Sequence, residues 1–288
     1  MDPTSLTTAY LRGATQRGAT LAEGCRVQEV VVEAGRVAGV RSVCGQPRPR
    51  DLALCRTADG QEVATSKVVV TAGAWSGLLA AKLGIQLPLV ASEHSYIVTE
   101  IIPGLEPGLP NLRVPDDAIY AKVQNQTLFL GAFEANPRFW EPVPGFPFGQ
   151  FDLNMEAYLP YLEAFSRRLP MLEAVGHRSI ICGPESFTPD GAPLFGETRE
   201  VAGLFLNCVM NSRGIQMSGG LGREMARLVA TGETGLDLHA LDVKRFPRQL
   251  RGDAAWVRTK TQEKHVKTYH VPVPWDQPLA ARWLTNEY

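Results

Sequence analysis

Three polar side chains have the character needed to handle an amine. His94 begins an alternating segment, so its imidazole could orient or deprotonate an amine in a cleft. Tyr120 and Glu134 belong to neighbouring predicted strands and could line the same cavity as a hydroxyl donor and a carboxylate. A plainer interpretation stands beside this one, because a single histidine is more often a hydrogen-bonded structural residue and a tyrosine can fill a core. The sequence leaves both interpretations open.

Two junctions between a predicted strand and a predicted helix are made of glycine and small residues. The first is centred on Gly73, and the second is Gly219 to Gly222, reached through a loop that contains Arg213. Backbone N–H groups at such corners can meet a large anionic cofactor, and Arg213 could bind a carboxylate bidentately. Tight turns that pack a helix on its strand, with a solvated loop arginine, are the alternative.

Several classes of function find no support in the motifs. Gly13 to Gly18 has the wrong spacing for a dinucleotide fingerprint and follows no strand. No G-x-S-x-G with a catalytic triad, no phosphate-binding G-x-x-x-x-G-K and no H-E-x-x-H is present, which disfavours hydrolases, nucleotidases and metalloproteases. The five cysteines lack C-x-x-C spacing, so we expect free thiols in a reducing compartment and no metal site.

The amino-acid composition limits the classes of partner that this protein is expected to bind. The 288 residues are 44% hydrophobic and 20% charged, with 29 Lys and Arg against 30 Asp and Glu. A net charge of -1 gives no strong attraction to nucleic acid or an anionic membrane, and the apolar runs fall far below the roughly 20 residues of a bilayer span. The first residues resemble neither a secretory signal nor a transit peptide, so any targeting signal is expected outside this sequence.

The elements that must position these side chains follow from periodicity and turn residues. Residues 26–33 and 36–42 predict a hairpin with its turn at Ala34-Gly35, and residues 62–71 predict a strand buried on both faces of a parallel sheet. The remaining predictions are short antiparallel strands at 95–100, 118–123 and 127–132, a helix at 154–169 kinked or broken by Pro160, a turn-rich connector at 183–191, a buried strand at 204–209, a helix at 223–231, and an extended wrap beyond 237.

Five segments together resemble a known family. They are Val70-Thr71-Ala72-Gly73-Ala74-Trp75, Phe133-Glu134-Ala135-Asn136-Pro137, Phe148-Gly149-Gln150-Phe151-Asp152-Leu153, Cys182 to Asp190 followed by Pro193 to Glu197, and Leu241 to Phe246. Their order over nearly the whole chain is similar to the sarcosine and dimethylglycine dehydrogenase group of D-amino-acid-oxidase-like flavoproteins. Phe151-Asp152-Leu153 and the Cys182 to Asp190 segment suit the sarcosine branch better.

The resemblance implies an FAD enzyme that oxidises an N-methyl amine by hydride transfer to flavin N5 and hydrolyses the iminium. Electrons would pass to an electron-transfer flavoprotein in the mitochondrial matrix. His94 and Tyr120 would face the substrate. The resemblance also implies contacts to FAD from Val27, Gly73, Trp75, Asn211, Ser212, Arg213, Gly214 and Ile215.

The implied fold is of the α/β (α+β) class, with an incomplete FAD-binding α/β domain and a mainly antiparallel β-sheet substrate domain. Residues 1–90 and 181–236 would form the FAD-binding portion, 91–180 the substrate portion, and 237–288 an extension towards a missing folate-binding region. Tetrahydrofolate would bind only through that absent region.

Two departures from the family pattern matter. The family's N-terminal glycine fingerprint and flavin-carrying histidine match nothing here, so we expect this polypeptide alone to bind FAD weakly or not at all. Arg213 stands where relatives usually carry a small residue, which alters the expected pocket beside the flavin. A second hypothesis is a non-catalytic regulator resembling the pyruvate dehydrogenase phosphatase regulatory subunit, and a third is a non-catalytic truncated product.

Overall fold

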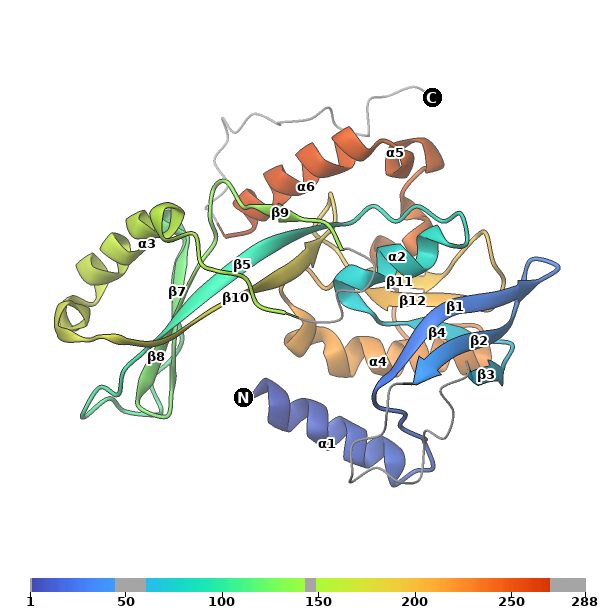
Figure 1. Cartoon of the computed structure of the whole chain (residues 1–288), viewed down its shortest axis with the longest axis horizontal. Coiled ribbons are helices and arrows are strands. Elements are labelled where there is room, and N and C mark those ends of the chain that lie inside the picture. Colours follow the sequence, from blue (N-terminus) through green and yellow to red (C-terminus); the bar gives the residue numbers. More distant parts are fainter. Residues whose placement is uncertain (1, 45–60, 143–148, 270–288) are drawn as a thin grey trace.

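The computed structural model describes residues 2–44, 61–142 and 149–269. Its strands form three sheets, and helices pack around them (Figure 1). The mixture of helices and strands confirms the α/β (α+β) class. None of the described helices combines the length and apolar character needed to cross a membrane.

The first sheet is antiparallel, in the order β1-β2-β3. Its strands are β1 (Cys25–Glu33), β2 (Arg36–Cys44) and β3 (Gln61–Ala64). Ala34 and Gly35 both have positive φ, 47° and 76°, as the tight turn of the predicted hairpin requires. The expectation of five free thiols is wrong at Cys25, which is disulfide-bonded, whereas Cys182 and Cys208 are free and buried.

The second sheet has the order β11-β12-β4 and holds the only parallel pair among the described strands. Its strands are β4 (Val68–Val70), β11 (Leu194–Glu197) and β12 (Leu204–Cys208). The predicted continuous strand at 62–71 is wrong: its first half joins β2 as β3, and only its second half enters the parallel pair. Val69 is 37% exposed, so β4 is not covered on both faces.

The helix α4 (Gly214–Thr231) begins nine residues before the predicted start at 223. Gly219, Gly220 and Gly222 therefore lie inside a helix and form no turn. A Cβ on Gly219 would lie 2.8 Å from the hydroxyl oxygen of Tyr10, in the exposed helix α1 (Pro3–Thr15), so this glycine permits a close approach between the two helices.

The third sheet is antiparallel throughout, in the order β10-β5-β8-β7-β6, with β9 paired to β5. Its strands are β5 (Val90–Thr99), β6 (Leu112–Val114), β7 (Ile119–Gln124), β8 (Thr127–Ala132), β9 (Phe139–Trp140) and β10 (His177–Phe187). The predicted antiparallel strands are confirmed. The predicted connector at 183–191 is wrong in its first half, because Gly183 to Phe187 continue β10 along β5.

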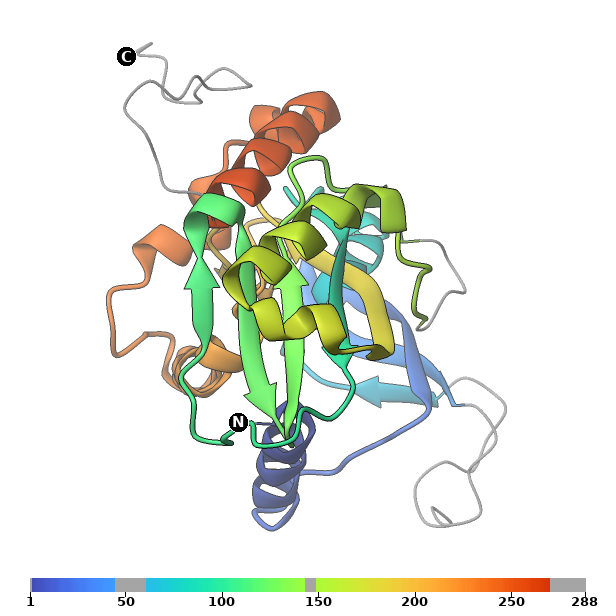
Figure 2. The ribbon, with the colours of Figure 1, turned by 90° about the vertical axis from the view of Figure 1, so that its left-hand side faces the viewer.

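Helices cover this sheet. The helix α3 (Met155–Arg168) runs through Pro160 without a break and packs on β7 and β8, as Figure 2 shows. Its buried Tyr158 donates a hydrogen bond to the carbonyl of Leu130 at 2.9 Å. The apolar core between α3 and the sheet is one of two main clusters; the other surrounds β4, β11 and β12.

The described part of the C-terminal segment is helical, where the sequence predicted an extended wrap. It contains α5 (Arg248–Gly252) and α6 (Ala254–Tyr269), and α6 packs against β5 (Figure 1). Short 3-10 helices η1 (Gly73–Trp75), η2 (Pro115–Asp117), η3 (Pro170–Ala174), η4 (His239–Leu241) and η5 (Val243–Arg245), with the short α2 (Ser76–Ala81), complete the described elements.

Candidate functional site

The two predicted corners lie side by side. β4 and β12 are parallel neighbours, with Val70 opposite Leu206, so the chain leaves both strands at the same edge of the sheet. β4 leads directly to Gly73 and β12 leads to the loop before α4. Ligands of open α/β sheets bind at the carboxyl ends of such strands.

The first corner is open at Gly73. This residue has a φ of +53°, and an added Cβ would meet nothing within 4 Å. Glycine is suited to this backbone conformation, and it leaves the space beside the chain clear. Trp75 at the end of η1 is half-buried, and its ring packs edge-on against Trp140 with centroids 5.7 Å apart.

The second corner is formed by residues before α4, not by the predicted glycines. Asn211 and Ser212 hold left-handed φ angles of 50° and 66°. The buried Asn211 stabilises this shape: its Oδ1 accepts a hydrogen bond from the Thr188 N–H at 2.9 Å, and its Nδ2 donates to the Val209 carbonyl at 2.7 Å. Asparagine is one of the few residues that adopt this conformation readily.

The strand β10 links both corners. It contacts η1, and its Glu185 Oε1 accepts a hydrogen bond from Ser212 Oγ at 3.0 Å. The other carboxyl oxygen, Glu185 Oε2, is buried and has no hydrogen-bond partner among the described residues. A buried acceptor of this kind normally has a donor, so the site is complementary to a group that donates a hydrogen bond there.

His94 and Tyr120 meet on one face of the antiparallel sheet. His94 Nε2 and the Tyr120 hydroxyl oxygen are 3.1 Å apart, and the His94 ring lies 4.5 Å from that of Phe133. Tyr120 reaches His94 because its ring lies over Gly131 on the strand between them. A Cβ on Gly131 would be 2.0 Å from Tyr120 Cζ, so a larger residue there is incompatible with this position of the ring.

The same face continues from His94 to Glu185. His94 pairs with Gly183, and Ser92 pairs with Glu185, so strand alternation directs all four residues to one side. An added Cβ on Gly183 would meet nothing within 4 Å. The missing side chain leaves space between the His94 imidazole and the carboxylate that contacts the second corner.

Sequence reasoning missed His265, which α6 buries behind His94. Its ring centroid lies 4.6 Å from that of Phe187 and 5.6 Å from that of Phe133, and its Nδ1 is 3.5 Å from Ser92 Oγ. Burial, with added repulsion from His94, lowers the pKa of His265 to about 3. A neutral ring therefore closes the site on this side near neutral pH.

Glu134 does not join this cluster. Burial is the main cause that raises the pKa of Glu134 to about 7, and repulsion from Glu93 adds to it. Glu93 alternates with His94 along β5 and pairs with Arg138 at 3.5 Å. The carboxylate suggested beside Tyr120 thus interacts with groups on the opposite face from His94.

The remaining predicted residues border the corners. Val27 and Ile215 are 43% and 42% exposed, and Gly214 is the first residue of α4. Arg213 is exposed, and its Nη2 donates a hydrogen bond to the Gly191 carbonyl. One side of its guanidinium is therefore engaged by the protein.

A partly buried ion pair, which the sequence analysis also missed, stabilises the turn beneath the second corner. Arg245 binds Asp190 bidentately, with Nε to Oδ2 at 2.7 Å and Nη2 to Oδ1 at 3.0 Å. It also donates to the carbonyls of Pro193, Leu241, Asp242 and Ala192. The turn that carries Thr188, and through it Asn211, is held by this arginine.

Comparisons with known proteins identify the family of the chain. Residues 1–228 match the family described as FAD dependent oxidoreductase, and residues 231–285 match the FAD dependent oxidoreductase central domain. Mitochondrial sarcosine dehydrogenase of Homo sapiens is 40% identical over all 288 residues. The mitochondrial pyruvate dehydrogenase phosphatase regulatory subunit of Mus musculus is 28% identical over 93% of the chain. The chain spans 30% and 29% of the lengths of these two relatives.

A solved structure shares the fold. The L-proline dehydrogenase of P. horikoshii superposes with a TM-score of 0.70 at 21% identity, over 86% of this chain and 60% of that one.

Proposed function

Because the chain belongs to the FAD dependent oxidoreductase family, we propose that it forms part of an enzyme that oxidises an N-methyl amine such as sarcosine. The observation that carries the proposal is the hydrogen-bonded pair of His94 and Tyr120, on the sheet face that continues to the two corners. The relative of higher identity is named a sarcosine dehydrogenase, which favours this substrate class over others.

The residues at the corners fit FAD. Gly73 leaves open backbone at one strand end, and at the other the first N–H groups of α4 have no intrahelical acceptor and no side-chain cap among the described residues. Glu185 Oε2 lacks a donor that a flavin or its ribityl chain contains. We propose that Val27 and Trp75 hold the adenine half, that Gly73 also contacts FAD, and that the loop Asn211, Ser212, Arg213, Gly214 and Ile215 lies along the isoalloxazine.

Bound FAD would supply the acceptor for the hydride that leaves carbon. The protein must first prepare the amine, because a protonated nitrogen has no lone pair to stabilise the carbon that loses hydride. His94 Nε2 and the Tyr120 hydroxyl, 3.1 Å apart, form a donor and acceptor pair that takes this proton. Phe133 and the neutral His265 pack beside the pair and exclude water from one side.

Arg213 would bind the carboxylate of an amino-acid-derived substrate. Its guanidinium lies at the start of α4, and the hydrogen bond to Gly191 fixes one nitrogen while other N–H groups remain. We further propose an electron-transfer flavoprotein as electron acceptor, action in the mitochondrial matrix, and tetrahydrofolate use only through chain beyond these residues.

The test begins with flavin binding. The chain is purified with added FAD, and bound flavin absorbance is measured; we expect weak retention, because no glycine fingerprint follows a strand in this sequence. Purified protein with one bound FAD per chain would contradict that expectation, and the proposal about the substrate would be unaffected. With FAD in excess, anaerobic mixing with sarcosine then follows flavin bleaching.

Variants of the pair identify its role. His94→Gln should slow bleaching about 100-fold or more, the usual loss for a proton-transferring residue, and Tyr120→Phe should slow it by less. Tyr96→Phe is the matched control, since Tyr96 shares the sheet face but stacks on Phe129. Unchanged rates in both site variants would refute the assignment. No bleaching by any N-methyl amine, together with specific binding of the phosphatase, would favour the regulatory subunit.

A further inference from the structure

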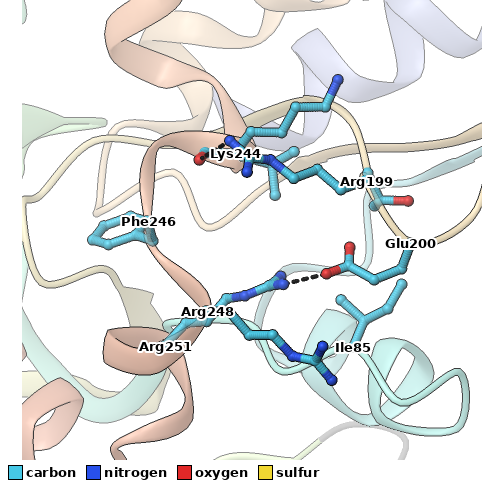
Figure 3. A pocket seen from close by; sticks show the side chains of 9 residues that line it. Ile85, Arg199, Glu200, Lys244, Phe246, Arg248 and Arg251 are labelled. Atoms are coloured by element: carbon cyan, nitrogen blue, oxygen red, sulfur yellow. Dashed lines mark hydrogen bonds and ion pairs between the residues drawn. The ribbon is translucent and has the colours of Figure 1, made fainter.

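A second concave site lies apart from the flavin and amine residues. A cavity of about 230 Å³ is enclosed by three segments: Ile85 after α2, residues 198–200 between β11 and β12, and residues 243–251 leading through α5 (Figure 3). None of the residues assigned to the flavin or the amine lines it. Its volume is far larger than the roughly 30 Å³ that one water occupies.

The lining is strongly cationic. Arg199, Lys244, Arg248 and Arg251 line it together with one carboxylate, Glu200. Arg199 Nη2 donates to the backbone carbonyl of Lys244 at 3.1 Å, and no carboxylate of the described residues pairs with its guanidinium. Within the described ranges, the Lys244 ammonium and the Arg248 guanidinium make no hydrogen bond or ion pair.

Arg251 adds a buried donor. Its side chain is 11% exposed, and its guanidinium binds Glu200 across the cavity, as the dashed line in Figure 3 shows. Burial tends to raise the pKa of Glu200, but the hydrogen bond and charge of Arg251 outweigh it and lower that pKa. Arg251 Nε is nevertheless buried without a partner in the described part of the chain. An unsatisfied buried donor is costly, so an acceptor is expected there.

We propose that this cavity binds a compact anion with two or more negative charges, of the phosphate or polycarboxylate class. Uncompensated like charges in a cavity repel one another, and a multivalent anion removes that repulsion. Guanidinium groups recognise the oxygens of phosphates and carboxylates in pairs, which suits the three arginines. The site is thus a second ligand site, and it does not rest on the proposed oxidation of an N-methyl amine.

Calorimetric titration of the 288-residue chain tests the proposal with pyrophosphate, citrate and inorganic phosphate at constant ionic strength. We expect saturable binding of one pyrophosphate or citrate per chain, and weaker binding of phosphate at its lower charge. Preference between pyrophosphate and citrate identifies which anion class the site takes. Lys244→Gln with Arg248→Gln should weaken binding about 100-fold, roughly tenfold for each lost charged contact.

Two matched variants keep the result interpretable. Arg12→Gln with Arg178→Gln removes two exposed cations elsewhere and should leave the affinity unchanged. Lys244→Arg with Arg248→Lys keeps both charges and should retain binding within a few-fold, and circular dichroism checks that every variant folds. Equal affinity of the chain and the charge-removing variant, or no saturable binding of any of the three anions, would overturn the proposal.

Discussion

Gly131→Ala tests whether the empty space above one glycine creates the His94–Tyr120 pair. The new Cβ would lie 2.0 Å from Tyr120 Cζ and 2.2 Å from its hydroxyl oxygen, whereas ordinary contact begins at 3.4 Å. The ring must therefore move by about 1.4 Å. A shift of that size away from Gly131 breaks the 3.1 Å hydrogen bond to His94.

Gly131→Ala should lower the free energy of unfolding through overpacking and through the lost hydrogen bond. Inserting a carbon into a packed region costs about 1–3 kcal/mol, and the hydrogen bond contributes about 1 kcal/mol. For a chain of this size, 1 kcal/mol lowers the melting temperature by about 2–4 °C, so a total of about 2–4 kcal/mol should lower it by about 4–16 °C in differential scanning fluorimetry. If the pair handles the amine, the rate of flavin bleaching should fall to about that of Tyr120→Phe.

Gly183→Ala is the matched control, because its Cβ meets nothing within 4 Å and should change stability by no more than about 1 kcal/mol. A double-mutant cycle isolates the clash. In a Tyr120→Ala background the ring is gone, so Gly131→Ala should cost little. An equal cost of Gly131→Ala with and without the Tyr120 ring would refute the reasoning.

Two further perturbations are predicted from buried charges. Asp190→Ala should destabilise the chain by roughly 3 kcal/mol in urea unfolding, because it leaves Arg245 charged and only 7% exposed; a loss below 1 kcal/mol would show that the backbone carbonyls suffice. Glu134→Gln should stabilise the chain more at pH 8 than at pH 5. The folded-state pKa of Glu134, about 7, lies above its ordinary value of 4.5, so its contribution to stability is full below pH 4.5 and is lost as pH rises through 7. Melting temperatures across this range check the prediction, and a pH-independent effect of the substitution would contradict it.

The sequence pattern placed three strands of the antiparallel sheet, β5, β7 and β8, close to their observed positions, although β5 and β8 are buried over most of their length on both faces. The turn at Ala34-Gly35 was predictable because its residues favour the positive φ angles that it adopts. The second half of β10 was not predictable from its residues, because Gly183 and Pro184 are typical of turns. The sheet tolerates them because β10 is an edge strand. It pairs with β5 on one side only, so the N–H that Pro184 lacks is not needed by a second neighbouring strand.

The second corner was misplaced because glycine is the usual sign of a turn. Here Asn211 and Ser212 adopt the left-handed conformation, held by contacts to Thr188 and Glu185 that lie over twenty residues away in sequence. Local sequence carries no information about such partners. The family motifs nevertheless indicated the loop from Asn211 to Ile215 as the one beside the cofactor, and that assignment stays a prediction.

α6 and His265 were missed for a different reason. Val257, Thr261 and His265 recur every four residues and are all buried, but two of them are polar, and Glu263 is buried as well. A search for apolar periodicity passes over such a helix. The helix could be recognised only from the four-residue spacing of its buried positions, and those positions are known only once α6 is seen to pack against β5.

His265 belongs to the second of the two family matches, so the chain cannot be cut between them without changing the amine site. Residues 1–228 and 231–285 match two separate family descriptions, yet the histidine behind the amine pair comes from the later part and rests on Phe133 and Phe187 of the earlier one. A truncation between these two matches would remove His265 and expose the rings of Phe133 and Phe187 to water. Solvent would then also reach the His94 imidazole, which packs on Phe133. Expression of residues 1–228 alone would therefore produce a chain with a damaged pocket, even where its secondary structure is retained.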